Sequence, residues 1–288
     1  MELIVDKSEE TSFENFYNQE EKDTNNFSYW YPKVKDFFRT PHTIIVKVPV
    51  DITQSILDQN NEKQVKDWIS KKLLPKIKSN FGESPICKFF IKNARYSNKF
   101  EFNTSCLCSA DVEELYKHIS LINYRSMETD ALGFTELVIR QFIQFDDATT
   151  PTIYNGLPLR PEYRVFYDFD KKRLLHTHDY WDYNYVSPNL HVFNDKIIFD
   201  YYQNIYKDKW NKHLDEVEDL VKSSIGGVNL KGIWSIDFLY SDCKEGFYFD
   251  QENKSLGRKS FEGIWLIDMA NAYQSAYRES ISEYLYDN

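Results

Sequence analysis

Two short segments near the end of the sequence repeat one pattern, which constrains the fold more than any other feature. Residues 232–237 and 263–268 both read Gly-Ile-Trp-x-Ile-Asp, so each apolar run ends on a carboxylate, Asp237 or Asp268. Such runs are typical of buried strands. If the strands pair, both carboxylates come within reach of one hard cation such as Mg²⁺, and Asn271 would add an amide oxygen. The alternative, that each Asp is an ordinary turn residue at a strand end, stays open here.

The charge and the cysteine content narrow the classes of function. The 288-residue chain has 35 Lys and Arg against 45 Asp and Glu, a net charge of −10, which disfavours nucleic acid and anionic membranes as partners. Its four cysteines form no CxxC pair, which is typical of reduced thiols. The N-terminal segment lacks the pattern of a secretory signal, and no apolar run reaches the about 20 residues that span a bilayer. We therefore expect a cytoplasmic protein with no nucleic-acid partner and no membrane partner.

The hydrophobic pattern mixes strands with helices. Residues 7–26 are acidic and poor in aliphatic side chains, so we expect residues 1–26 to form a poorly ordered or loosely docked arm. No internal repeat and no glycine-rich linker divides the remaining chain. A serine cap opens the helix that begins at Ser109. The predicted elements are strands at 43–49, 87–92, 134–145, 162–169, 232–240 and 263–269, and helices at 51–79, 109–119 and 197–224.

Charged residues upstream of the two aspartates complete a set that suits a nucleotide. Lys92 ends an apolar strand, where its ammonium is placed to neutralise a phosphate. Glu162 and Arg164 share one face of a strand; the guanidinium matches two phosphate oxygens, and the carboxylate would accept from a ribose hydroxyl. Arg140 is paired with Glu136 in the same way. The order of these residues predicts a nucleotide clamp between two sheets, although surface salt bridges and a solvated lysine are the alternatives for the individual residues.

Other nucleotide and catalytic motifs are absent from the sequence. There is no GxxxxGK[ST] or GxGxxG loop, no HExxH and no GxSxG elbow. His176 and His178 form an HxH pair on a predicted strand, for which exposure on one sheet face is a simpler explanation than metal binding. The phosphate-binding loops of the common nucleotide folds therefore do not apply to this chain.

A series of short segments matches, in order, the motifs of a known family. The segments are FSYWYPKV (27–34), TIIVKVP (43–49), FIK (90–92), TSC (104–106), ELVIR (136–140), EYRVF (162–166) and WLID (265–268). In these the chain resembles a divergent member of the cell-division-cycle D-one-two-three family, which are ATP-grasp proteins that help to assemble eukaryotic translation initiation factor two. The family's last motif is Asp-aromatic-Asn-Pro, whereas this chain has Asp268-Met-Ala-Asn271, with Asn one position later and no Pro.

The resemblance implies an α+β, ATP-grasp fold, in which two lobes with mixed or antiparallel sheets sandwich ATP and Mg²⁺. The lobes would be residues 27–133, which include the N-terminal part, and residues 134–288, which hold the metal site. It implies the nucleotide-binding residues Lys92, Arg140, Gln141, Phe142, Ile143, Glu162 and Arg164, and the metal ligands Asp237, Asp268 and Asn271.

The resemblance also implies a function. The protein would be an assembly chaperone that binds ATP, Mg²⁺ and a translation initiation factor subunit similar to eukaryotic initiation factor two gamma, and it would be a monomer on its own. The alternative is an ATP-dependent carboxylate–amine ligase that forms an acyl phosphate, for which Arg95, Lys99 and Arg160 would receive the carboxylate. A scaffold that binds no nucleotide is a third hypothesis. Whether the protein is an enzyme stays open.

Overall fold

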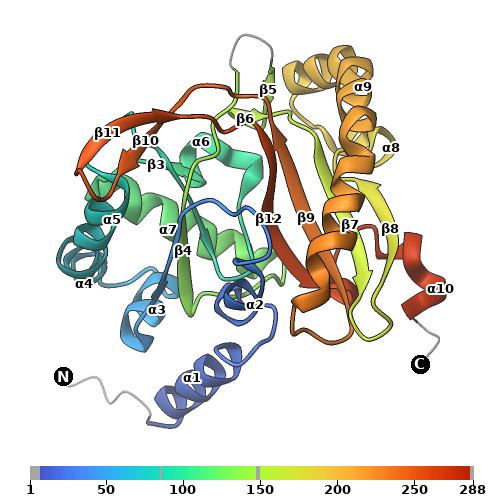
Figure 1. The fold of residues 1–288 in the computed structure, drawn as a ribbon. Coiled ribbons are helices and arrows are strands. Elements are labelled where there is room, and N and C mark those ends of the chain that lie inside the picture. Colours follow the sequence, from blue (N-terminus) through green and yellow to red (C-terminus); the bar gives the residue numbers. More distant parts are fainter. Residues whose placement is uncertain (1–6, 85, 147–149, 286–288) are drawn as a thin grey trace.

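Two four-stranded antiparallel sheets form the centre of the molecule. The computed structural model describes residues 7–84, 86–146 and 150–285, and for residues 7–12 the backbone alone. Within these ranges each sheet has helices on one face, and two short hairpins lie at the periphery (Figure 1). The combination of helices with antiparallel sheets agrees with the predicted α+β class.

The first sheet has the strand order β1-β4-β2-β3. Its strands are β1 (Thr43–Lys47), β4 (Glu136–Gln141), β2 (Phe89–Asn93) and β3 (Leu107–Cys108). Because side chains alternate along a strand, Phe89, Ile91 and Ile139 pack into a core with the helices, whereas Lys92 and Arg140 lie on the other face. The helices of this core are α3 (Val50–Leu57), α4 (Glu62–Trp68), α5 (Leu74–Phe81) and α7 (Val112–Glu128).

Two helix boundaries differ from the sequence-based prediction. The single helix expected at 51–79 is interrupted between α3 and α4, where Gln59 and Asn61 adopt left-handed backbone conformations, and a π-helical turn at Ile69–Leu73 joins α4 to α5. Helix α7 is capped by Asp111, whose Oδ1 accepts from the Glu114 backbone N–H, and not by Ser109. Asp111 wins this role because its side chain reaches the free N–H of the first turn.

The second sheet has the order β12-β9-β7-β8 and holds the two repeated segments as neighbouring strands. Its strands are β12 (Gly263–Asn271), β9 (Ile233–Ser241), β7 (Glu162–Asp168) and β8 (Arg173–Asp179). One face packs against helix α9 (Phe193–Ser224), where Tyr163 stacks on Trp210 at 5.3 Å between ring centroids and donates to its carbonyl. The opposite face carries Arg164, Asp237 and Asp268.

Shorter elements complete the fold. The hairpins are β5 (Thr152–Ile153) with β6 (Leu157–Pro158), and β10 (Gly246–Asp250) with β11 (Ser255–Lys259). The remaining helices are α1 (Lys7–Glu20), α2 (Phe27–Val34), α6 (Phe102–Ser105), α8 (Tyr183–Val186) and α10 (Ser282–Leu285). In the ranges that the structure covers, no helix combines the length and the apolarity needed to cross a membrane.

The acidic N-terminal segment is more ordered than its composition predicts. Residues 1–6 lie outside the described residues. Helix α1 begins at Lys7, and two of its side chains contact the segments that follow β1 and β2. Tyr17 is buried and its hydroxyl donates to the Val48 carbonyl, while Glu20 forms an ion pair with Arg95. A buried aromatic side chain and a partly buried ion pair therefore anchor a helix whose aliphatic content is low.

Candidate functional site

Three charged residues form a row across the second sheet. In the register of the strands, Arg164 on β7 lies opposite Asp237 on β9, and Asp237 lies opposite Asp268 on β12. Residues directly opposite each other in an antiparallel pair point to the same face, with their Cβ atoms about 4.5–5.5 Å apart. The two carboxylates therefore lie side by side on one face, as the repeated sequence pattern predicts.

Arg164 and Asp237 form a bidentate ion pair. The Nε and Nη2 atoms of Arg164 donate to Oδ1 and Oδ2 of Asp237 at 2.8 and 2.7 Å, and both side chains are largely buried. Burial by itself lowers the pKa of Arg164, but the Asp237 carboxylate outweighs this effect and raises it. The guanidinium therefore keeps its charge in the folded protein, and Asp237 is the partner that makes its burial possible.

The first sheet contributes two buried cations to the same place. The Lys92 ammonium lies 2.5 Å from Oδ2 of Asp268, and Arg140 donates to the backbone carbonyls of Leu266 and Ile267 on β12. Burial lowers the pKa of Arg140 to about 10, although the Asp268 carboxylate acts in the opposite direction. Cations from one sheet therefore bind the edge strand of the other sheet.

A small cavity of about 70 Å³ lies between the two sheets. Glu162, at the start of β7, accepts a hydrogen bond from the Lys99 ammonium at 3.2 Å. Burial lowers the pKa of the nearby Arg160 to about 10. Arg160 donates to the Ile143 carbonyl at 2.6 Å, but its Nε is buried and has no hydrogen-bond partner in the described part of the chain. The cavity walls include the side chains of Phe90, Phe102, Gln141, Phe142, Ile143, Leu239 and Ile267. It combines apolar walls with charged groups, as nucleotide sites do.

A much larger open cleft of about 1170 Å³ adjoins this cavity. Lys99 and Asp268 line both spaces, and Arg164 and Asp237 line the cleft. Aromatic side chains surround it, among them Tyr96, Tyr154, Tyr180, Trp181, Tyr185 and Tyr277. The cleft has the size of a ligand site, whereas the cavity alone is smaller than the about 300 Å³ at which such sites begin.

The local charge is opposite in sign to that of the whole chain. The charged residues that line the small cavity, together with the Arg164–Asp237 pair, are five cations and three acids. This leaves an excess of two positive charges in a protein with a net charge of −10. The cations are Lys92, Lys99, Arg140, Arg160 and Arg164, and the acids are Glu162, Asp237 and Asp268. A region of this kind attracts anions even when the molecule as a whole repels them.

Asn271 does not join the two aspartates. It lies three residues after Asp268 on the same strand, and an odd number of residues places it on the opposite sheet face, across from Trp234. Its Oδ1 accepts from the Tyr273 backbone N–H and caps a short helical turn. We therefore correct the expected metal-ligand set by removing Asn271 from it.

The other residues predicted to bind the nucleotide lie around the small cavity or next to it. Two further residues, which the sequence suggested only for a ligase, lie there as well. Gln141 ends β4, and Phe142 and Ile143 follow it; all three line the small cavity with Lys92, Arg140 and Glu162. Lys99 and Arg160, proposed from the sequence only for a ligase, are part of this same wall.

His176 and His178 lie on β8 with ring centroids 5.8 Å apart. Outside the cleft, Cys108, Glu114 and His118 come together, although the sequence analysis gave them no role. The i, i+4 spacing of Glu114 and His118 was the available signal.

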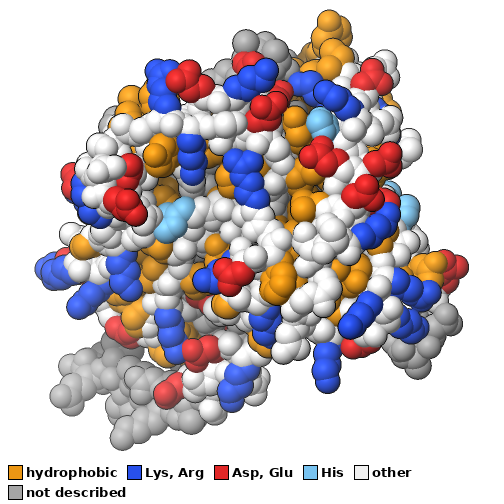
Figure 2. Space-filling model, viewed as in Figure 1, with side chains coloured by type: hydrophobic (Ala, Val, Ile, Leu, Met, Phe, Trp, Pro, Cys, Tyr) orange, Lys and Arg blue, Asp and Glu red, His pale blue; other side chains and the backbone are white. Residues whose placement is uncertain are grey.

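Neither the surface charges nor the comparisons with known sequences identify a ligand for the cleft. On the face seen in Figure 2, acidic and basic side chains are interspersed. No family model matches the sequence, and no curated protein is significantly similar to it.

One solved structure shows a weak likeness. N5-carboxyaminoimidazole synthetase from Staphylococcus aureus, complexed with ADP, has 9% sequence identity and a TM-score of 0.34. The match covers 85% of this chain and 44% of that protein, so the chain spans less than half of its length. A likeness at this level defines neither a shared fold nor a shared activity, and the family resemblance in the sequence stays a prediction.

Proposed function

We propose that the protein binds ATP with Mg²⁺ between its two sheets, in the manner of ATP-grasp proteins. The supporting observation is that charged residues from four different strands meet where the small cavity adjoins the cleft: Arg164, Asp237 and Asp268 line the cleft, and Lys92 lines the cavity and pairs with Asp268. The excess of positive charge around the small cavity and the Arg164–Asp237 pair favours a polyanion. The buried Nε of Arg160 supports the same proposal because a polar ligand would satisfy it.

The side chains suggest a division of labour. The apolar walls formed by Phe102, Phe142 and Ile143 suit a nucleobase, and Lys92 and Arg164 suit the phosphates. Asp237 and Asp268 supply the carboxylate oxygens that Mg²⁺ takes alongside phosphate oxygens and water. When bound, the metal would neutralise phosphate charge and fix the orientation of the triphosphate.

Binding requires three rearrangements of the described structure. The cavity of about 70 Å³ must widen to admit a base, and the bidentate Arg164–Asp237 pair must open to admit phosphate and metal. Lys92 must also exchange its contact with Asp268 for a phosphate. Phosphate and metal replace the two halves of that ion pair together, so no charge is left without a partner. The proposal therefore predicts that ATP and Mg²⁺ bind better together than either does alone.

The basic residues favour a binding role over a ligase. A ligase needs cations that are available for a carboxylate substrate, and Arg95, Lys99 and Arg160 were the candidates. Arg95 pairs with Glu20 and Asp23, and Lys99 pairs with Glu162. Arg160 uses Nη1 to hold the Ile143 carbonyl, and its Nε, which has no partner among the described residues, belongs to the small cavity that we assign to the nucleotide. We therefore propose an ATP-dependent assembly chaperone, and the identity of its partner as a translation initiation factor subunit rests on the family resemblance alone.

Calorimetric titration tests the nucleotide proposal. Wild-type protein titrated with ATP should bind one equivalent, with affinity at least tenfold higher in the presence of Mg²⁺. The variants Asp237→Asn and Asp268→Asn should lose this metal dependence, because an amide is a weaker ligand for a hard cation. Asn271→Ala and Asp250→Asn, a change in the hairpin of β10 and β11, are matched controls that should bind as the wild type does. Binding that is equally strong in all five proteins would overturn the metal assignment.

A second measurement separates the two functions. If the protein is a chaperone, ADP should not accumulate above the background when ATP is incubated with candidate amino acids or peptides. A stable complex with an initiation factor subunit should form in the presence of ATP and Mg²⁺. ADP release that depends on an added carboxylate would instead support the ligase.

A further inference from the structure

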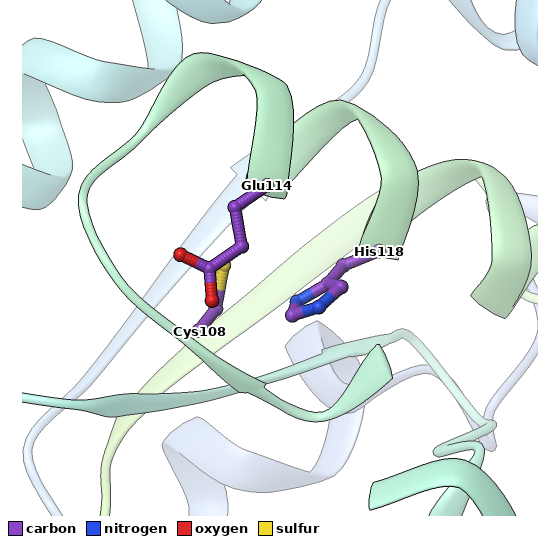
Figure 3. Close-up of side chains that lie close together, drawn as sticks. All are labelled: Cys108, Glu114 and His118. Atoms are coloured by element: carbon purple, nitrogen blue, oxygen red, sulfur yellow. The ribbon is translucent and has the colours of Figure 1, made fainter. Parts of the chain in front are cut away.

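A second cluster of side chains, outside the nucleotide cleft, has the composition of a metal site. Cys108 ends strand β3, and Glu114 and His118 lie one turn apart on helix α7. Both helix residues project toward the cysteine (Figure 3), and the donor atoms of the three side chains all lie within 4.8 Å of one another. We propose that Cys108, Glu114 and His118 bind one divalent cation of the zinc type.

His118 supplies an observation that is independent of this proximity. Its side chain is buried, and its Nδ1 has no hydrogen-bond partner among the residues described. An unsatisfied buried polar group is destabilising, and Leu115 and Ile119 on the same helix are apolar and offer it no partner. A bound cation would give this side of the imidazole the partner that it lacks.

The donor set selects the class of metal. Zinc takes cysteine sulfur, histidine nitrogen and carboxylate oxygen, at about 2.0–2.3 Å in tetrahedral geometry, whereas Mg²⁺ and Ca²⁺ prefer oxygen ligands. Ligands this close to one ion lie nearer to each other than 4.8 Å, so the side chains must rotate slightly inward. Three protein ligands leave a fourth position, and water can fill it from the side where the Glu114 side chain is partly exposed.

Three existing contacts must yield when the cation binds, and one of them is the Cys108 S–H that donates to the Ser109 backbone carbonyl. The Ser109 hydroxyl donates to the Glu114 carboxylate, and the Lys88 ammonium lies 4.0 Å from the same group. Lys88 is exposed, so this ion pair is weak. At Cys108 the S–H bond breaks, a sulfur–metal bond forms and the proton passes to solvent, which makes binding weaker in acid.

The position of the cluster indicates what the cation would do. Strand β3 has only two residues and lies at the edge of the first sheet, where Cys108 pairs with Phe89 of β2. A cation shared by β3 and α7 would tie this edge strand to the helix that covers the sheet. Since β2 also carries Lys92, the metal would stabilise the wall of the cleft without taking part in nucleotide binding.

Cobalt provides a spectroscopic probe for the site. Full-length, metal-free protein titrated with Co²⁺ should bind one equivalent with a thiolate-to-metal charge-transfer band, and added Zn²⁺ should displace it. The band should disappear in Cys108→Ser and persist in Cys87→Ser, a matched change at another buried cysteine. It should also persist in Asp268→Asn, which separates this site from the proposed magnesium site.

Glu114→Gln guards against a loss of folding in the Cys108 variant. Glu114 is partly exposed, so this variant should fold, and its affinity for Co²⁺ should fall at least tenfold. Zn²⁺ should raise the melting temperature of the wild type, by ligand linkage, more than that of Glu114→Gln. The proposal is overturned if the wild type gives no charge-transfer band, or if folded Cys108→Ser or Glu114→Gln binds as tightly as the wild type.

Discussion

The two sheets meet through charges that are satisfied in different ways. Within the second sheet, Arg164 and Asp237 form a bidentate pair between neighbouring strands, and both are largely buried. Between the sheets, Lys92 is only 2% exposed but its partner Asp268 is 32% exposed. An ion that water can reach loses less when its partner leaves. The pair within the sheet therefore contributes more to stability, and the pair between the sheets is the one that a ligand exchanges at the lower cost in free energy.

The largest expected effect comes from breaking the pair within the second sheet. Asp237→Ala leaves the Arg164 guanidinium buried without its counter-charge, and removal of one partner from a buried pair costs about 3–5 kcal/mol. Urea denaturation of the variant and the wild type measures this loss of unfolding free energy. A loss below about 1 kcal/mol would show that the pair is solvated, which would remove the contrast between the two pairs.

A double variant provides the control for this comparison. Arg164→Met combined with Asp237→Leu removes both charges and keeps much of the side-chain volume. Because no unpaired charge remains, this protein should recover most of the stability that Asp237→Ala loses. A double variant as unstable as Asp237→Ala would assign the loss to packing and not to the unpaired guanidinium.

A smaller effect is expected for the pair between the sheets. Lys92→Met leaves Asp268 partly exposed to water, so we expect a loss of about 1–2 kcal/mol, in the range of a charged hydrogen bond. Lys47→Met is the matched control, because Lys47 lies on β1 of the same sheet and makes an exposed ion pair with Glu21. That change should cost less than about 1 kcal/mol. If Lys92→Met and Lys47→Met lose equal amounts of unfolding free energy, the buried Lys92–Asp268 pair is worth no more than an exposed surface pair.

The same contrast explains how far the sequence could be interpreted. The pattern Gly-Ile-Trp-x-Ile-Asp predicted two strands with neighbouring carboxylates, because strand alternation and apolar runs are local properties. The alternation of side chains along a strand also predicted that Glu162 and Arg164 lie on one face of β7. The face of Asn271 also follows from that period, since it lies an odd number of residues from Asp268, and the expectation that Asn271 joins the metal ligands overlooked this.

Residues in irregular segments could not be placed in this way. Arg160 lies in the loop before β7 and Lys99 in a short helical turn, so no period assigns their direction. Cys108 meets Glu114 and His118 only because a two-residue strand pairs at a sheet edge, which is a tertiary event. The anchoring of α1 likewise depends on partners far along the chain, as the Tyr17 contact with Val48 shows.

The smallest expected effect concerns the pH dependence of the row that contains Arg164. His178 on β8 lies opposite Arg164, and its ring contacts that of Tyr277 at 4.0 Å. Burial lowers the pKa of His178, with His176 and Lys207 acting in the same direction and Asp182 and Asp179 opposing it.

The unfolded chain, with a histidine pKa of about 6.5, therefore binds this proton more readily than the folded protein does. Unfolding free energy should fall as the pH drops below about 6.5 and level off below the folded pKa. In His178→Gln this part of the slope should be smaller, whereas the exposed His191→Gln serves as the matched control. Urea denaturation between pH 5 and 8 gives the slopes. If His178→Gln keeps the wild-type slope, the loss of unfolding free energy at low pH arises from other groups. His178, next to Arg164 in the second sheet, then makes no pH-dependent contribution to the stability of that sheet.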